Sequence, residues 1–302
     1  MNLRQLQYFV TVAEELHFGR AADRLHMSQP PLSQQIISLE ESLGVQLFAR
    51  TKRSVQLTAV GEQWLPEVRQ VLAAATELPH KARRLSRGEI GTLSLAFVST
   101  ADYGVLPGLL QRYRAQHPNV QVTLREATSD VQIDALLNQE IDIGIVIPPR
   151  GMAFPKSLRY LPLRKERLVV ALPQAWVRSR KHRPTHGQID FRTLLDEPLI
   201  VFPRQSAPAF HDLIADYYTA HQATPRIGQE AIQMQTIISL VSVGMGIALV
   251  PESLQNLQRT GVVYVQLSGA APEVETGLLW RKDQASAAVD GLMAAAKMQA
   301  HR

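Results

Sequence analysis

The first sixty residues constrain the fold most tightly, because they predict three short helices packed on one another. Apolar residues recur every three or four positions over residues 3–13, the spacing of a single helix face. The segment His17-Phe18-Gly19 interrupts this pattern, and Ala21 and Ala22 follow it. Small side chains let two helices approach closely, so we expect a compact helical unit at the N-terminus.

A third helix is predicted to follow Ser28. Serine is a favoured N-cap residue. The next residues include Pro30 and Pro31, which a first helical turn tolerates because its N–H groups lack intrahelical partners. Gly44 is suited to end the helix. The expected buried face comprises Leu32, Ile36, Leu39 and Leu43.

The opposite face of this helix carries Pro30, Ser33, Gln34 and Ile37 when it is projected at about 100° per residue. Short hydroxyl and amide groups near a helix N-terminus suit base-edge and phosphate contacts in a DNA major groove. Ile37 has two interpretations, contact with a thymine methyl group or packing on the neighbouring β-ribbon.

That ribbon is predicted from two short strands, Leu47-Phe48 and Val55-Gln56-Leu57. The basic tip Arg50-Thr51-Lys52-Arg53 lies between them. A basic tip on a β-ribbon is the wing that grips phosphate or enters the minor groove. Taken alone the tip is also typical of a solvated turn, but its place after a helix-turn-helix favours a wing.

Residues 1–60 resemble the DNA-binding domain of LysR-type transcriptional regulators. The resemblance rests on an ordered set of motifs: Leu6-Gln7-Tyr8-Phe9, Phe18-Gly19-Arg20-Ala21-Ala22, Ser28-Gln29-Pro30-Pro31-Leu32-Ser33-Gln34-Gln35-Ile36, Leu39-Glu40, Leu43-Gly44, Leu47-Phe48-Ala49-Arg50 and Leu57-Thr58-Ala59-Val60-Gly61. It implies that Gln29, Pro30, Ser33, Gln34 and Arg53 approach DNA. Many family members carry arginine where this chain has Gln34, so the base preference there stays open. With Ile37 and Arg50, these residues make up the predicted DNA-binding set.

A long helix is predicted from Thr58 to about Ser86, within a linker over residues 59–88 that follows a DNA-binding domain over residues 1–58. Gly61, Leu65, Val68, Leu72, Ala75 and Ala82 lie near the spacing of a coiled-coil seam. An amphipathic helix packed on its own domain has the same pattern. The need for paired half-sites on DNA, and the resemblance, favour dimers and tetramers. Pro66 and Pro79 predict a kink or a break near Pro79.

Residues 89–302 alternate between strand and helix patterns, which predicts an α/β domain with a mostly parallel sheet. This part resembles the effector domain of the same family, which is similar to periplasmic binding proteins. The resemblance implies two lobes, one formed by residues 90–161 and 267–302 and the other by residues 162–266. The overall prediction is an α/β multidomain protein with a winged helix-turn-helix, a linker helix and a two-lobed sensor.

Ligands of open α/β sheets bind beyond the carboxyl ends of strands, where helix N-termini point inward. The hydroxyls and free N–H groups expected there favour a carboxylate or similar anion, although Ser99 and Thr100 are also ordinary N-cap residues. The segment 99–107 is similar to the family branch that responds to muconates and aromatic-degradation intermediates. The predicted effector site comprises Ser99, Thr100, Thr128, Ile147, Phe202, Pro203 and Arg204.

Other functional classes find little support in the sequence. The chain has no cysteine, so it has neither disulfides nor thiolate metal sites. We identify no catalytic pattern, metal site or cofactor motif, and we expect no enzyme. A solute-binding protein is the main alternative, but no signal peptide is recognisable. We expect a cytoplasmic regulator that does not bind membranes and whose partners are operator DNA, an effector, further copies of itself and RNA polymerase. A net charge of +5 is compatible with DNA binding.

Overall fold

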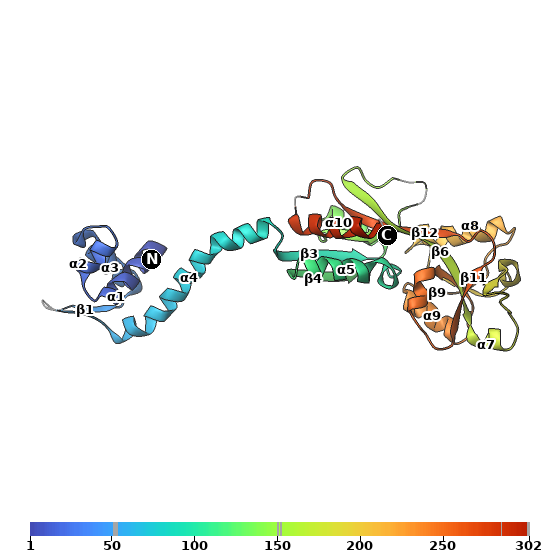
Figure 1. The fold of residues 1–302 in the computed structure, drawn as a ribbon, viewed down its shortest axis with the longest axis horizontal. Coiled ribbons are helices and arrows are strands. Elements are labelled where there is room, and N and C mark those ends of the chain that lie inside the picture. Colours follow the sequence, from blue (N-terminus) through green and yellow to red (C-terminus); the bar gives the residue numbers. More distant parts are fainter. Residues whose placement is uncertain (51–53, 150, 152, 285, 301–302) are drawn as a thin grey trace. The chain divides into compact units, whose positions relative to one another are not determined.

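The computed structural model describes the chain except for residues 51–53, 150, 152, 285 and 301–302, and the side chains of residues 299 and 300. It divides into two compact units, Met1–Arg84 and Leu85–Arg302 (Figure 1). This division lies inside the predicted linker. The two units are described separately below.

The first unit begins with the three predicted helices, α1 (Leu3–Glu15), α2 (Phe18–Arg24) and α3 (Gln29–Leu43). The short antiparallel strands β1 (Phe48–Arg50) and β2 (Val55–Leu57) follow, with Phe48 opposite Leu57. The core contains Phe9, Phe18 and Phe48, which pack ring to ring. A winged helix-turn-helix is therefore confirmed.

The start of α3 differs in detail from the prediction. Ser28 occupies the N-cap position, but its side chain makes no capping hydrogen bond. The two prolines in the first turn remove backbone donors, so a capping hydroxyl has fewer partners there. Gly44 ends the helix in the left-handed conformation, as expected, with φ of 70°.

Glu40 joins α3 to the wing. Its Oε1 accepts hydrogen bonds from the backbone N–H groups of Leu47 at 2.8 Å and Phe48 at 3.0 Å. Its Oε2 accepts a hydrogen bond from the Arg50 guanidinium at 2.8 Å, and this guanidinium also lies 5.0 Å from the centre of the Phe18 ring. One carboxylate thus sets the position of β1 relative to the helix.

The linker helix α4 (Ala59–Ser86) has the predicted bounds. The Oγ1 of Thr58 accepts a hydrogen bond from the Gly61 N–H at 3.0 Å and caps the helix. The helix contains Pro66 and Pro79 without a break, contrary to one of the two expectations. In its first half, Leu65, Val68 and Leu72 pack on the core of the winged helix. The first half of the predicted coiled-coil seam therefore packs on the DNA-binding domain of its own chain, which was the alternative interpretation of the pattern.

In the second unit, the first lobe is built on three strands, with β3 lying between β4 and β5 and parallel to both. Helix α10 packs beside α5. The elements are β3 (Ile90–Phe97), a 3-10 turn (Ala101–Tyr103), α5 (Val105–Gln116), β4 (Asn119–Glu126), α6 (Ser129–Leu137), β5 (Ile143–Val146), and, from the end of the chain, β12 (Glu273–Arg281) and α10 (Ala287–Ala300).

The second lobe is built around the C-terminal part of a long strand, β6 (Leu158–Pro173). Strand β6 pairs with β12 up to Arg167, and from Leu168 it pairs with β10 and β11. The remaining elements are α7 (Gln174–Arg178), β7 (Gln188–Ile189), β8 (Leu199–Val201), α8 (Pro208–Ala220), β9 (Ile227–Glu230), α9 (Met234–Ser242), β10 (Ala248–Pro251), β11 (Val262–Leu267) and 3-10 turns at Phe191–Leu194 and Glu252–Asn256.

The sheet is mixed, which corrects the expectation of a mostly parallel one. All pairings of β6 are antiparallel, as is the pairing of β12 with β5. The alternation of strand and helix patterns predicted that neighbouring strands run parallel. This pattern carries no information about a strand such as β6, which is shared between the two lobes.

Replacing Glu40 with alanine is expected to loosen the wing. The substitution leaves two backbone N–H donors and one guanidinium unpaired, which should lower the free energy of unfolding of this domain by about 1–3 kcal/mol. Hydrogen–deuterium exchange of residues 45–50 should rise. Glu41→Ala is the matched control, since Glu41 is exposed and the described structure gives its side chain no hydrogen bond or ion pair. Equal exchange in the two variants would contradict the role of Glu40.

Candidate functional site

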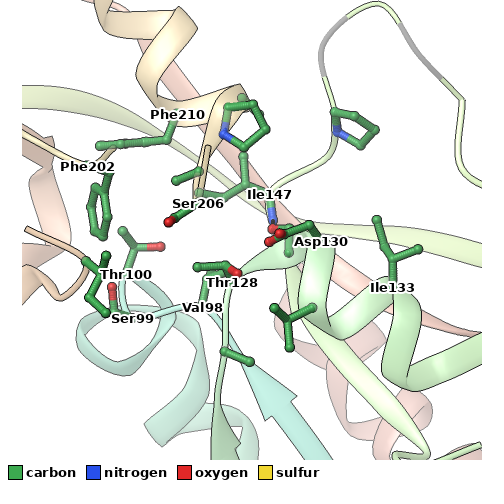
Figure 2. Close-up of a pocket in the computed structure, with 18 of the residues that line it drawn as sticks. Val98, Ser99, Thr100, Thr128, Asp130, Ile133, Ile147, Phe202, Ser206 and Phe210 are labelled. Atoms are coloured by element: carbon green, nitrogen blue, oxygen red, sulfur yellow. Dashed lines mark hydrogen bonds between the residues drawn. The ribbon is translucent and has the colours of Figure 1, made fainter. Parts of the chain in front are cut away.

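A cavity of about 660 Å³ lies between the lobes of the second unit (Figure 2). Its walls are formed by the segments after β3, β4 and β5, the first turns of α6 and α8, and the segment before α9. The first lobe contributes Val98, Ser99, Thr100, Arg125, Glu126, Ala127, Thr128, Ser129, Asp130, Val131, Ile133, Ile147, Pro149, Ala153, Phe154 and Pro155, and the second contributes Phe202, Ser206, Ala207, Pro208, Ala209, Phe210, Ile232 and Gln233. The volume is in the usual range of small-molecule sites.

Five of the seven predicted effector residues line this cavity, namely Ser99, Thr100, Thr128, Ile147 and Phe202. Pro203 and Arg204 are not among its lining residues. Arg204 points to Asp212 instead, donating to both carboxylate oxygens at 2.7 and 3.0 Å. These hydrogen bonds lower the pKa of Asp212. A sequence position after a strand does not reveal such a competing local partner.

Two polar groups at the cavity lack the partners expected in a folded protein. Thr100 is 5% exposed, and its Oγ1 is buried with no hydrogen-bond partner among the described residues. Thr128 is the N-cap residue of α6, yet its side chain makes no capping bond. Buried polar groups are nearly always paired, and helix N-termini leave N–H donors unsatisfied. The cavity therefore offers free hydrogen-bonding capacity to a ligand.

The N-terminus of α6 is fixed to β5 by two side chains. The Ile147 N–H donates to Ser129 Oγ at 3.0 Å. The fully buried Gln132 donates from Nε2 to the carbonyl oxygens of Ala127 at 2.8 Å and Ile145 at 3.1 Å. Gly144 leaves room for this amide, because a Cβ there would lie 2.6 Å from Gln132 Oε1. The hydroxyl-bearing wall of the cavity is thus rigidly held.

The other wall is apolar and aromatic. Phe202 and Phe210 are both buried, with ring centres 5.7 Å apart in an edge-to-face arrangement. Sequence reasoning found Phe202 but missed Phe210 and the segments 153–155 and 206–209. It also missed Asp130, although Thr128-Ser129-Asp130 is a recognisable helix start. The loop segments carry no comparable signal.

Among the described residues of the lining, Arg125, Glu126 and Asp130 are charged. Arg125 lies 3.5 Å from the Glu140 carboxylate, which balances its charge. Neither Glu126 nor Asp130 has a cationic partner among the described residues. Partial burial raises the pKa of Glu126, and the nearby Asp102 carboxylate adds to this shift.

The first unit presents the predicted DNA-facing residues along α3. Gln29, Pro30 and Gln34 are exposed, and Ser33 and Ile37 are half-buried. Ile37 borders a surface depression together with Phe48 and Arg50 of β1, which supports its packing beside the wing. The ion pair with Glu40 gives Arg50 a structural role, and its contact with DNA stays a prediction. Arg53 lies outside the described residues.

Comparisons with known proteins agree with this arrangement. The family model of the bacterial regulatory helix-turn-helix of the LysR family matches residues 3–62, and that of the LysR substrate binding domain matches residues 86–300. The chain is 54% identical to the HTH-type transcriptional regulator IlvR of Caulobacter vibrioides, over 97% of this chain and 96% of that one. It is 40% identical to AlsR of Bacillus subtilis, over 94% and 91%. The solved structure of full-length CbnR with its target DNA is 27% identical and covers 99% of this chain and 100% of that one, with a TM-score of 0.76.

The chain belongs to the LysR family of transcriptional regulators.

Regulators of this family bind operator DNA, respond to small molecules and form oligomers. The LysR regulator described here accordingly combines a DNA-binding domain with an effector-binding domain and is not an enzyme. Among its described residues, no helix is long and apolar enough to cross a membrane.

Thr100→Val tests whether the buried hydroxyl is free for a ligand. Because this hydroxyl has no partner among the described residues, its loss should leave the free energy of unfolding unchanged or raise it by less than about 1 kcal/mol. Thr58→Val is the comparison, since it removes a hydroxyl that caps α4 and should destabilise by about 1 kcal/mol. If both variants lost stability equally, Thr100 would have a structural partner.

Proposed function

We propose that this LysR regulator binds an operator through the exposed face of α3 and the wing, and that a small carboxylate in the interlobe cavity changes its activity. The observation that carries the proposal is the cavity itself, with its unpaired Thr100 hydroxyl and the uncapped N-terminus of α6. A role on chromosomal DNA places the protein in the cytoplasm.

On the DNA side, Gln29, Pro30, Ser33 and Gln34 are proposed to meet the major groove. They lie in the first two turns of α3, where the exposed amides of Gln29 and Gln34 and the half-buried hydroxyl of Ser33 accompany the positive end of the helix dipole. Arg53 is proposed to contact phosphate from the wing. Gln34 favours adenine, the base that amide side chains bind with two hydrogen bonds.

On the effector side, a carboxylate is proposed to bind at Thr100, Ser99 and the N-terminus of α6, where hydroxyl and N–H donors meet. The edge-to-face pair of Phe202 and Phe210 supports an apolar or aromatic body for the ligand. Ligand contact with both lobes would favour one arrangement of the lobes over others already populated. Through the oligomer, this shift would reach the DNA-binding domains and the contact with RNA polymerase.

An exposed apolar stripe of α4 that begins at Val71 is proposed to form the dimer. Val71, Leu78 and Leu85 repeat every seven residues and are 48%, 62% and 49% exposed. Such a heptad stripe is typical of a helix that pairs with a second helix. The sensor domain also exposes apolar side chains outside the cavity, namely Leu137 at the end of α6 and Val243 and Met245 after α9, which favours further contacts in a tetramer.

Ser33→Ala is expected to weaken binding to the DNA upstream of the protein's own gene by about tenfold, because one good base contact contributes about 1–3 kcal/mol. Ser42→Ala is the control. Ser42 lies in the last turn of the same helix, where its hydroxyl donates to the Leu39 carbonyl. Mobility shifts with unrelated competitor DNA measure both. Equal affinities would remove Ser33 from the interface, and wild-type binding without sequence preference would count against the proposed operator.

Leu78→Lys is expected to convert dimers into monomers, because a charged group would then lie in the proposed seam. Glu77→Lys introduces the same side chain on the neighbouring residue, outside the apolar stripe, and should leave the assembly intact. Sedimentation velocity of both variants gives the mass directly. An unchanged mass for Leu78→Lys would show that this stripe does not hold the dimer together.

A further inference from the structure

The charges around the interlobe cavity narrow the chemical class of its ligand. Glu126 and Asp130 face this region without a cationic partner among the described residues, and Arg125 is balanced by Glu140. Figure 2 places Asp130 on the first turn of α6 beside Thr128, with Thr100 and Ser206 bordering the same space. The described lining therefore carries more negative than positive charge.

This balance disfavours a ligand with two carboxylates. Like charges a few ångströms apart repel strongly in a partly dry site, so a dianion would meet Asp130 and Glu126 unfavourably. It also disfavours a simple amine, because an ammonium group has no acceptor for the uncapped N–H donors in the first turn of α6. The site combines groups for an anion with groups for a cation.

We propose that the ligand is an α-amino acid with an apolar side chain. Its carboxylate binds at Thr100 and the N-terminus of α6, and its ammonium group pairs with Asp130, with Glu126 adding to the negative potential. Its side chain packs on Phe202 and Phe210. The proposal rests on the proposed function, in that it takes the interlobe cavity as the effector site.

Each part of this ligand matches a separate observation. The Oγ1 of Thr100 is buried without a described partner, so it has hydrogen-bonding capacity for a carboxylate. Asp130 provides the counter-charge for the ammonium group, and such charge-assisted hydrogen bonds are the stronger ones. The two phenylalanines are 5% and 2% exposed and form an apolar wall contributed by the other lobe. One small zwitterion thus contacts both lobes.

Matched ligands test the proposal on the full-length protein. L-leucine is compared with 4-methyl-2-oxopentanoate, which lacks the ammonium group, and with 3-methylbutylamine, which lacks the carboxylate. L-phenylalanine and phenylpyruvate form a second pair, and cis,cis-muconate serves as the dianion. Thermal shift and calorimetric titration should show binding of the amino acids, with each truncated analogue weaker by about 10-fold or more.

Asp130→Asn should weaken amino-acid binding about 10-fold or more and abolish the preference for leucine over its oxo acid. Asp134→Asn, one turn later on the same helix and outside the cavity lining, is the matched control. An acidic residue in a first turn also stabilises its helix. A purely structural role of Asp130 would lower the unfolding midpoint but leave the ligand preference intact.

The outcomes separate this proposal from the proposed function. If the oxo acids or muconate bind as well as or better than the amino acids, the amino-acid proposal is overturned and a carboxylate effector stands. If no ligand of the panel binds while operator binding remains specific, the amino-acid proposal is also overturned, and the DNA-binding half of the proposed function survives. Loss of specific operator binding would overturn the proposed function itself.

Discussion

The architecture of the sensor depends on one strand that serves both of its lobes. Strand β6 pairs with β12 through Arg167 and then with β10 and β11 from Leu168 onward. Strand β6 is thus paired along its whole length, on one edge in the first lobe and on both edges in the second, and it runs unbroken from one lobe to the other. The loops that follow β3, β4 and β5 in one lobe and β8 in the other meet at one cavity. A ligand in that cavity would therefore contact both lobes.

The two walls of the cavity differ in chemistry and in how they are held. The first lobe supplies hydroxyls, the α6 N-terminus and carboxylates, and Gln132 and Ser129 fix this wall to β5. The second lobe supplies the phenylalanine pair. The polar groups of the cavity thus lie on the wall that is fixed to β5, and the apolar groups lie on the opposite wall, which belongs to the second lobe.

In the DNA-binding domain, side chains that stabilise the fold also position the face that is proposed to contact DNA. Glu40 is held in α3 and bonds to the start of β1, so the recognition helix and the wing form one unit. The motifs Leu39-Glu40 and Leu47-Phe48 were both recognisable in the sequence, but the hydrogen bonds that join them were not. Arg50 was predicted as a DNA contact from its place in the basic tip that follows the helix-turn-helix, whereas its ion pair with Glu40 depends on a contact between elements.

The sequence by itself determined the local elements, since helix periodicity, proline and glycine positions and strand alternation act over a few residues. It thereby determined the winged helix, the bounds of α4 and five of the seven predicted effector residues as cavity lining. Only the tertiary structure decided which faces are covered and which charges are paired. It packed the first half of α4 on its own domain, turned Arg204 to Asp212 and left Thr100 and Asp130 without described partners. Such pairings join residues far apart in the chain or compete locally, and no periodicity encodes them.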